Sequence, residues 1–133
     1  MWAKKLIKWY HKNKRDLPWR KNNHPYNIWL SEIILQQTNV TQGTPYYLKF
    51  IKKYPTIFDL SKASENEVLK VWQGLGYYSR AKRIYQSSKV LFEFIGKGRS
   101  SDPSFWPIEL EQWIELPGIG RSTAGSIISS AFD

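Results

Sequence analysis

Apolar residues recur along most of this chain at the 3.6-residue spacing of α-helices, and no stretch alternates as a strand would. The predicted helices lie at residues 2–10, 28–38, 45–54, 65–73, 81–95, 107–114 and 121–132. No internal repeat or low-complexity linker divides them. We therefore expect an all-α protein of about seven helices.

Several residues indicate where these helices begin and end. Asn27 is a candidate N-cap of the second helix, and Pro45 suits the first turn of the third. Residues 64–67 (Ser-Glu-Asn-Glu) form a capping-box pattern, and Gly74 is expected to end the helix that follows. Pro107 is expected to open the sixth helix.

The helix predicted at 28–38 is apolar on almost every side, which is typical of a helix in the middle of a core. Glu32 lies within this run, and Gln36 follows one turn later on the same face. Burial of an ionised carboxylate is unfavourable unless the group is paired or its pKa rises. A carboxylic acid that stays protonated near neutral pH can act as a general acid. The alternative is a structural role, with Glu32 facing solvent or paired with a basic residue.

Residues 116–125, Leu-Pro-Gly-Ile-Gly-Arg-Ser-Thr-Ala-Gly, predict a tight turn between two helices. Gly118 and Gly120 permit positive φ and allow a ligand to approach the backbone closely. The free N–H groups of the turn and of the next helix would form a site for an anion, to which Arg121 adds charge. A DNA phosphate is the expected ligand. The alternative is a plain helix–turn–helix connection in which the glycines serve only the turn.

Two further segments combine aromatic and basic residues. Residues 15–20 place Trp19 between two arginines and directly after Pro18, so that its ring could stack on a base or fill the core. Residues 74–80 place two tyrosines between glycines and a basic helix. They could wedge into a duplex or simply end the preceding helix.

Composition favours a polyanionic partner and excludes several kinds of site. The 133 residues include 20 Lys and Arg against 11 Asp and Glu, a formal net charge of +9, and 16% aromatic residues, which together favour nucleic acid. The absence of cysteine excludes disulfides, thiolate metal sites and a cysteine nucleophile. No apolar run is long enough to cross a membrane and no signal-peptide pattern is present, so we expect a cytoplasmic location.

Taken together, these segments resemble the MutY family of adenine DNA glycosylases, which are helix-hairpin-helix glycosylases. The resemblance is carried, in order along the chain, by residues 17–20, 25–26, 29–38, 74–80 and 116–125. It implies an all-α six-helix barrel that ends in the helix-hairpin-helix, beside an incomplete second helical lobe. Residues 23–133 would form the barrel, and residues 1–22 would be the helix and loop of the second lobe.

The resemblance also implies an activity and roles for individual residues. MutY enzymes hydrolyse the N-glycosidic bond of adenine mispaired with 8-oxoguanine or guanine in double-stranded DNA, after flipping the adenine out of the duplex. The residue matching Glu32 protonates adenine at N7, and the bond breaks through an oxocarbenium-like state. The other implied residues are those of the adenine pocket (Arg15, Trp19, Arg20), of the mispair contact (Leu35, Gln36, Gln37, Thr38, Tyr77) and of the phosphate contact (Gly118, Gly120, Arg121, Ser122).

The sequence departs from the family pattern at its C-terminal side. The family's catalytic aspartate in an Asp-Gly-Asn setting, the four cysteines of its 4Fe–4S cluster and its 8-oxoguanine-reading domain all come later, and Asp133 does not have that setting. We expect a truncated, monomeric chain without cofactor and with little or no catalysis of its own. A full-length member would carry the cluster.

Two other functions stay open. An endonuclease III-like glycosylase/lyase would use a lysine of the hairpin's second helix to form a Schiff base. The matching residue here is Ser122, and Glu32 would have no role in that reaction. The other alternative is a non-catalytic helical module that binds DNA.

Overall fold

A computed structural model describes residues 24–36, 39–74 and 78–132. These residues form the helices α2 (Pro25–Leu35), α3 (Val40–Lys53), α4 (Ile57–Ser61), α5 (Glu65–Trp72), α6 (Tyr78–Ile95), α7 (Leu110–Ile114) and α8 (Arg121–Phe132), with a 3₁₀ helix at Pro103–Phe105. The predicted all-α class is confirmed, and no strand occurs in the described ranges. The helix predicted at 2–10 lies outside them.

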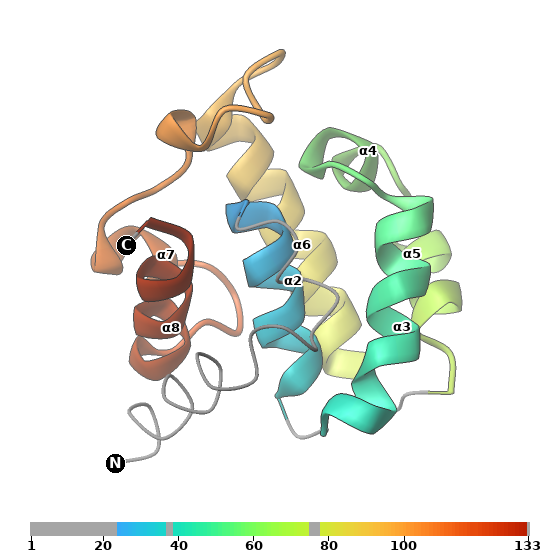
Figure 1. The fold of residues 1–133 in the computed structure, drawn as a ribbon. Helices are drawn as coiled ribbons and strands as arrows, with labels where there is room; N and C mark the ends of the chain where they lie inside the picture. Colours follow the sequence, from blue (N-terminus) through green and yellow to red (C-terminus); the bar gives the residue numbers. More distant parts are fainter. Residues whose placement is uncertain (1–23, 37–38, 75–77, 133) are drawn as a thin grey trace.

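Helix α2 is the centre of the fold. It contacts α3, α6 and α8, and Figure 1 shows it between α8 on one side and α3 on the other. Nine of its eleven residues are buried, on all sides of the helix. A helix that is apolar all round is stable only when other elements cover it completely, which explains why the sequence gives α2 no polar face.

Aromatic residues make up much of the core around α2. The side chains of Trp29, Trp72, Trp106 and Trp113 are at most 2% exposed. Trp106 stacks on Trp113 with ring centroids 6.4 Å apart, and Phe50 meets Trp72 edge-on at 5.9 Å. These four tryptophans therefore stabilise the fold and offer no ring to a base, so the aromatic content alone did not indicate stacking on nucleic acid.

Three helices begin at other residues than predicted, and two of them are α2 and α3. His24, not Asn27, is the N-cap of α2, because its Nδ1 accepts a hydrogen bond from the Tyr26 N–H at 3.1 Å. Asn27 lies inside the helix, where its side-chain amide donates to the hydroxyl of Tyr47 on α3 at 3.0 Å. Pro45 is likewise inside α3, which begins five residues earlier after the cap Asn39.

Capping boxes begin two other helices, α4 and α5. The capping box of Ser64 and Glu67 is confirmed, with hydrogen bonds of 3.0 and 3.2 Å between each side chain and the other residue's N–H. A second box, Thr56 with Asp59, opens the short helix α4, which the sequence did not predict. Helix α7 begins at Leu110 rather than at Pro107. No helix in the described ranges is both long and apolar enough to cross a membrane.

Candidate nucleic-acid interface

The turn between α7 and α8 needs a glycine at Gly118 but not at Gly120. Gly118 has φ +81°, and a Cβ atom there would come within 2.6 Å of the Arg83 side chain. Gly120 has no positive φ, and a Cβ atom there would meet nothing within 4 Å. Conformation and packing therefore both require Gly118, whereas Gly120 does not adopt the positive φ that a glycine permits. Gly120 is exposed and leaves open space beside the backbone.

Helix α8 presents its N-terminus on the surface directly after this turn. Arg121 and Ser122 are exposed, and the Ala124 N–H makes a helical hydrogen bond with the Gly120 carbonyl at 2.9 Å. The N–H groups that precede Ala124 in the first turn have no partner four residues back within the helix. Together with the positive end of the helix dipole, they are suited to an anion.

Two other helices hold the turn in place. From α6, the Ser87 hydroxyl donates to the Pro117 carbonyl at 3.2 Å, and the Arg83 side chain packs against Gly118. From the end of α2, the Gln36 side-chain amide donates to the Gly118 carbonyl at 3.2 Å. The candidate anion site is thus built from three segments that are far apart in the sequence.

Glu32 is buried in the second half of α2, with 4% of its surface exposed. Loss of water around the buried carboxyl group raises its pKa from 4.5 to about 8. The group is therefore mostly protonated at neutral pH. The predicted burial is confirmed and solvent exposure of Glu32 is excluded, and the raised pKa agrees with the predicted protonation.

Glu32 and the hairpin lie on the same side of α2. Gln36 follows Glu32 by one turn, so the two side chains share a face. The Gln36 amide reaches the Thr123 hydroxyl of α8 at 3.4 Å, as well as the Gly118 carbonyl. Leu35 beside it is half-buried and packs against the core. The protonated acid thus lies about one helical turn, roughly 5 Å, from the residue that contacts the hairpin.

Arg80 is a residue of this region whose role the sequence did not indicate. It is 2% exposed, and its Nη1 donates to the Ile34 carbonyl at 3.1 Å and to the Gln36 carbonyl. Its guanidinium lies 5.4 Å from the centre of the Trp72 ring. The contact spans more than 40 residues, so no local pattern reveals it. The available signal was periodicity, because Arg80 lies one turn before Ile84 on the buried face of α6.

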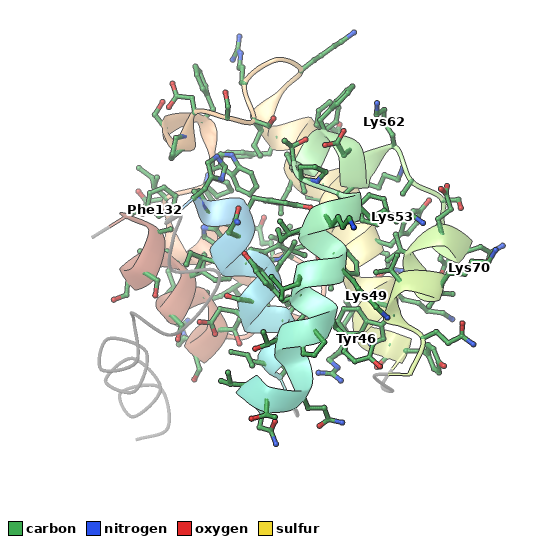
Figure 2. All side chains as sticks on the ribbon, turned by 45° about the vertical axis from the view of Figure 1, so that its right-hand side comes forward. Tyr46, Lys49, Lys53, Lys62, Lys70 and Phe132 are labelled. Atoms are coloured by element: carbon green, nitrogen blue, oxygen red, sulfur yellow. The ribbon has the colours of Figure 1, made fainter. Side chains whose placement is uncertain are left out.

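Within the described residues, positive charge is not concentrated at the hairpin. Figure 2 shows four lysines around α3, α4 and α5, on the other side of the molecule from Phe132 at the end of α8. They are Lys49, Lys53, Lys62 and Lys70. Three of them lie over neighbouring rings, Lys49 over Tyr46 at 5.3 Å, Lys53 over Tyr54 at 5.7 Å and Lys62 over Phe58 at 4.2 Å. These charges can attract a polyanion at long range, whereas Arg121 lies at the helix end itself.

Part of the predicted site lies outside the described residues. This holds for Arg15, Trp19 and Arg20 of the predicted pocket and for Gln37, Thr38 and Tyr77 of the predicted mispair contact. Within the described ranges, no group of three or more His, Cys, Asp or Glu side chains is placed to hold a metal ion. Because the sequence has no cysteine, it offers no thiolate for an iron–sulfur cluster.

Known proteins identify the family of this arrangement. The model of the HhH-GPD superfamily of base excision DNA repair proteins matches residues 30–130. The chain belongs to this superfamily. The HhH-GPD match includes the second half of α2, with Glu32, and the hairpin, which are the two parts of the candidate site.

Sequence relatives of this HhH-GPD chain include adenine DNA glycosylases. The adenine DNA glycosylase of Buchnera aphidicola subsp. Acyrthosiphon pisum is 45% identical over 125 residues, which cover 93% of this chain and 34% of the relative. That of Homo sapiens is 40% identical over 136 residues, covering 96% of this chain and 24% of the relative. The resemblance to the MutY family is confirmed, and the chain spans about a third or less of the length of these relatives.

Solved structures share the HhH-GPD fold. A thermostable thymine-DNA glycosylase superimposes with a TM-score of 0.73 at 26% identity, covering 98% of this chain and 58% of that one. An endonuclease III trapped as a covalent intermediate with DNA gives a TM-score of 0.73 at 19% identity, covering 98% and 57%. At that identity, the likeness to endonuclease III shows a common fold and nothing about the reaction.

Proposed function

We propose that this chain is the part of a MutY-type adenine DNA glycosylase that binds the DNA backbone and protonates the base. The observation that carries the proposal is a carboxylic acid, Glu32, that is buried and protonated one helical turn from a residue bound to the hairpin. The substrate would be double-stranded DNA with adenine opposite 8-oxoguanine or guanine, bound by a monomer in the cytoplasm. Residues 23–133 would form the barrel, and residues 1–22 would belong to a second lobe.

The hairpin would hold the phosphate backbone. Exposed N–H groups at Gly120, Arg121 and Ser122 would bind phosphate oxygens, and the close turn at Gly118 would allow the backbone to approach. A backbone grip carries no sequence information, so selection of the mispair would need other residues. We assign that part to Leu35, Gln37, Thr38 and Tyr77, because the side chain of Gln36, which the resemblance places with them, is bound to Gly118 and Thr123 of the hairpin.

Adenine would then leave the duplex and enter a pocket formed by Arg15, Trp19 and Arg20. The Glu32 carboxyl group would donate its proton to N7, and the electron pair of the glycosidic bond would leave with the neutral base. The sugar would become an oxocarbenium ion that water attacks at C1′, with loss of a proton. A buried acid with pKa near 8 is suited to this step because it keeps its proton at neutral pH.

Two parts of the family's machinery would come from outside these 133 residues. One is the aspartate that stabilises the oxocarbenium ion, and the other is the 4Fe–4S cluster with its four cysteines. We therefore expect a polypeptide of residues 1–133 alone to bind the mispair without releasing adenine at a useful rate.

The test separates binding from release. The Glu32→Gln variant keeps the size of the side chain but has no proton to give. We would compare it with the wild type in this chain and in a chimera that joins residues 1–133 to the remaining two thirds of the Buchnera relative. We expect the wild-type chimera to release adenine from an 8-oxoguanine:adenine duplex, and the variant chimera to bind with similar affinity and release none.

Two results would contradict the proposal. Continued adenine release by the Glu32→Gln chimera would show that the acid is wrongly assigned. Failure of the wild-type chain to bind any duplex would reject the hairpin as a phosphate site. Binding by the chain together with an inactive wild-type chimera would favour the non-catalytic DNA-binding module.

A further inference from the structure

The carboxyl end of α2 is held by two side chains from the same small region. Arg80 of α6 donates to the Ile34 and Gln36 carbonyls. Gln36, which follows α2 as its cap residue, donates to the Gly118 carbonyl and to the Thr123 hydroxyl. The backbone of Gln36 is thus bound to α6 while its side chain is bound to the hairpin.

Arg80 is suited to hold a helix end for physical reasons. The last carbonyls of a helix lack intrahelical partners and form the negative end of the helix dipole. The two hydrogens on Nη1 can serve both carbonyls at once, and the planar guanidinium lies over the Trp72 ring in a way that a compact lysine ammonium does not reproduce. Burial under the Trp72 ring keeps water from competing for these carbonyls.

We propose that Arg80 and Gln36 are positioning residues that fix the distance between the buried carboxyl group of Glu32 and the hairpin that would bind phosphate. Arg80 sets where α2 ends, and Gln36 ties that end to Gly118. Glu32, one turn earlier on the same rigid helix, is thereby held at a constant place relative to the backbone that would bind phosphate. The inference rests on the proposed function, because it supposes that the hairpin binds a duplex and that Glu32 meets a base.

The positioning role predicts a loss of selectivity rather than a general loss of affinity. In Arg80→Met the side chain keeps much of its volume but loses its donors. We expect its preference for an 8-oxoguanine:adenine duplex over the fully paired duplex to fall about tenfold, while its affinity for the paired duplex changes by less than about twofold, since the hairpin is intact. Arg80→Lys keeps the charge but binds the two carbonyls less well, so its preference for the 8-oxoguanine:adenine duplex should lie between those of the wild type and Arg80→Met.

Arg99→Met is the matched control. It also removes one positive charge, but from an exposed arginine just beyond the other end of α6. Fluorescence anisotropy gives both affinities, and 2-aminopurine in place of the adenine reports extrusion of the base from the stack. Arg99→Met should leave the preference and the 2-aminopurine signal as in the wild type, whereas Arg80→Met should lower both.

A second variant is needed because removal of a buried arginine can prevent folding. Gln36→Leu replaces a half-buried side chain and leaves Arg80 in place. In the free protein, the Ile119 and Ala124 amides donate hydrogen bonds within the hairpin at 3.1 and 2.9 Å. We expect both amides to exchange about tenfold faster in Gln36→Leu, and Thr123→Val to add little further effect in the Gln36→Leu background.

The outcomes distinguish this inference from the proposed function. If the wild type prefers the mispair, and both Arg80→Met and Gln36→Leu keep that preference, the two residues are merely structural and the inference is overturned. If the wild type binds no duplex, the proposed function fails. In that case, unchanged exchange in Gln36→Leu would also overturn the link between α2 and the hairpin, and faster exchange would support it.

Discussion

The burial of Glu32 predicts that wild-type stability falls as the pH rises from about 4.5 to about 8. The carboxyl pKa is 4.5 when the chain is unfolded and about 8 when it is folded. Between these values the folded state holds a proton that the unfolded state has lost, so the free energy of unfolding decreases with pH. At about 1.4 kcal/mol per pH unit, the loss is roughly 3 kcal/mol by pH 7 and roughly 5 kcal/mol above pH 8.

Glu32→Gln should remove this dependence. The neutral amide has almost the same shape and does not titrate, so the variant should become more stable than the wild type as the pH rises. The difference should approach roughly 5 kcal/mol above pH 8, which is a large part of the 5–15 kcal/mol typical of a domain. Urea unfolding followed by tryptophan fluorescence at several pH values between 4.5 and 9 measures it.

The difference between the two proteins isolates Glu32 from other titrating groups. Burial lowers the pKa of His24, so its contribution is present above pH 6.5 and is lost as the pH falls through the folded pKa, opposite in sign to that of Glu32. It is common to both proteins and cancels. The exposed Glu93→Gln is the control and should leave the pH profile of the wild type unchanged. Parallel curves for the wild type and Glu32→Gln would refute a dry, protonated carboxyl group.

Two further predictions concern the hairpin. Gly118→Ala should destabilise the fold by about 1–3 kcal/mol, because a Cβ atom there combines positive φ with a clash against Arg83. Gly125→Ala, in open space within α8, should instead stabilise it by about 0.5–1 kcal/mol. A urea midpoint of Gly118→Ala as high as that of Gly125→Ala would show that neither the positive φ nor the contact with Arg83 matters. Arg121→Glu should weaken binding to paired and mispaired duplexes alike and lower the salt dependence of the affinity. A selective loss for the mispair, or a wild-type affinity that does not change with salt, would contradict a phosphate contact.

Local physics made much of the fold predictable. The all-round apolar run of α2, the capping box at Ser64 and the glycine at Gly118 are each visible in a short stretch of sequence, so each could be recognised before the packing was known. The predicted start of α2 was wrong because an uncommon capping residue begins this helix. His24 caps α2 through a ring nitrogen, and a side-chain hydrogen bond to Tyr47 takes Asn27 into the helix.

The candidate site could be predicted only in part, because some of its contacts join segments that are far apart in the sequence. Glu32 stood out because a carboxylate in an apolar helix is unfavourable wherever the rest of the chain lies. Arg80 could not stand out in this way, since its partners are carbonyl groups that every residue has, more than 40 positions away in the sequence. The orientation of Gln36 toward Gly118 likewise depends on how α2, α6 and α8 pack.

The central position of α2 has a consequence for synthesis of the protein. A helix without a polar face cannot bury its apolar side chains by itself. Helix α8, which covers one side of α2, follows about 90 residues later in the sequence. At ribosomal rates of roughly 5–20 residues per second, α8 is synthesised roughly 5–20 s after α2, and the apolar side chains that α8 covers stay exposed during that time. Until α8 has been synthesised, the side of α2 that α8 covers can be buried only by other contacts, such as partial collapse with α3.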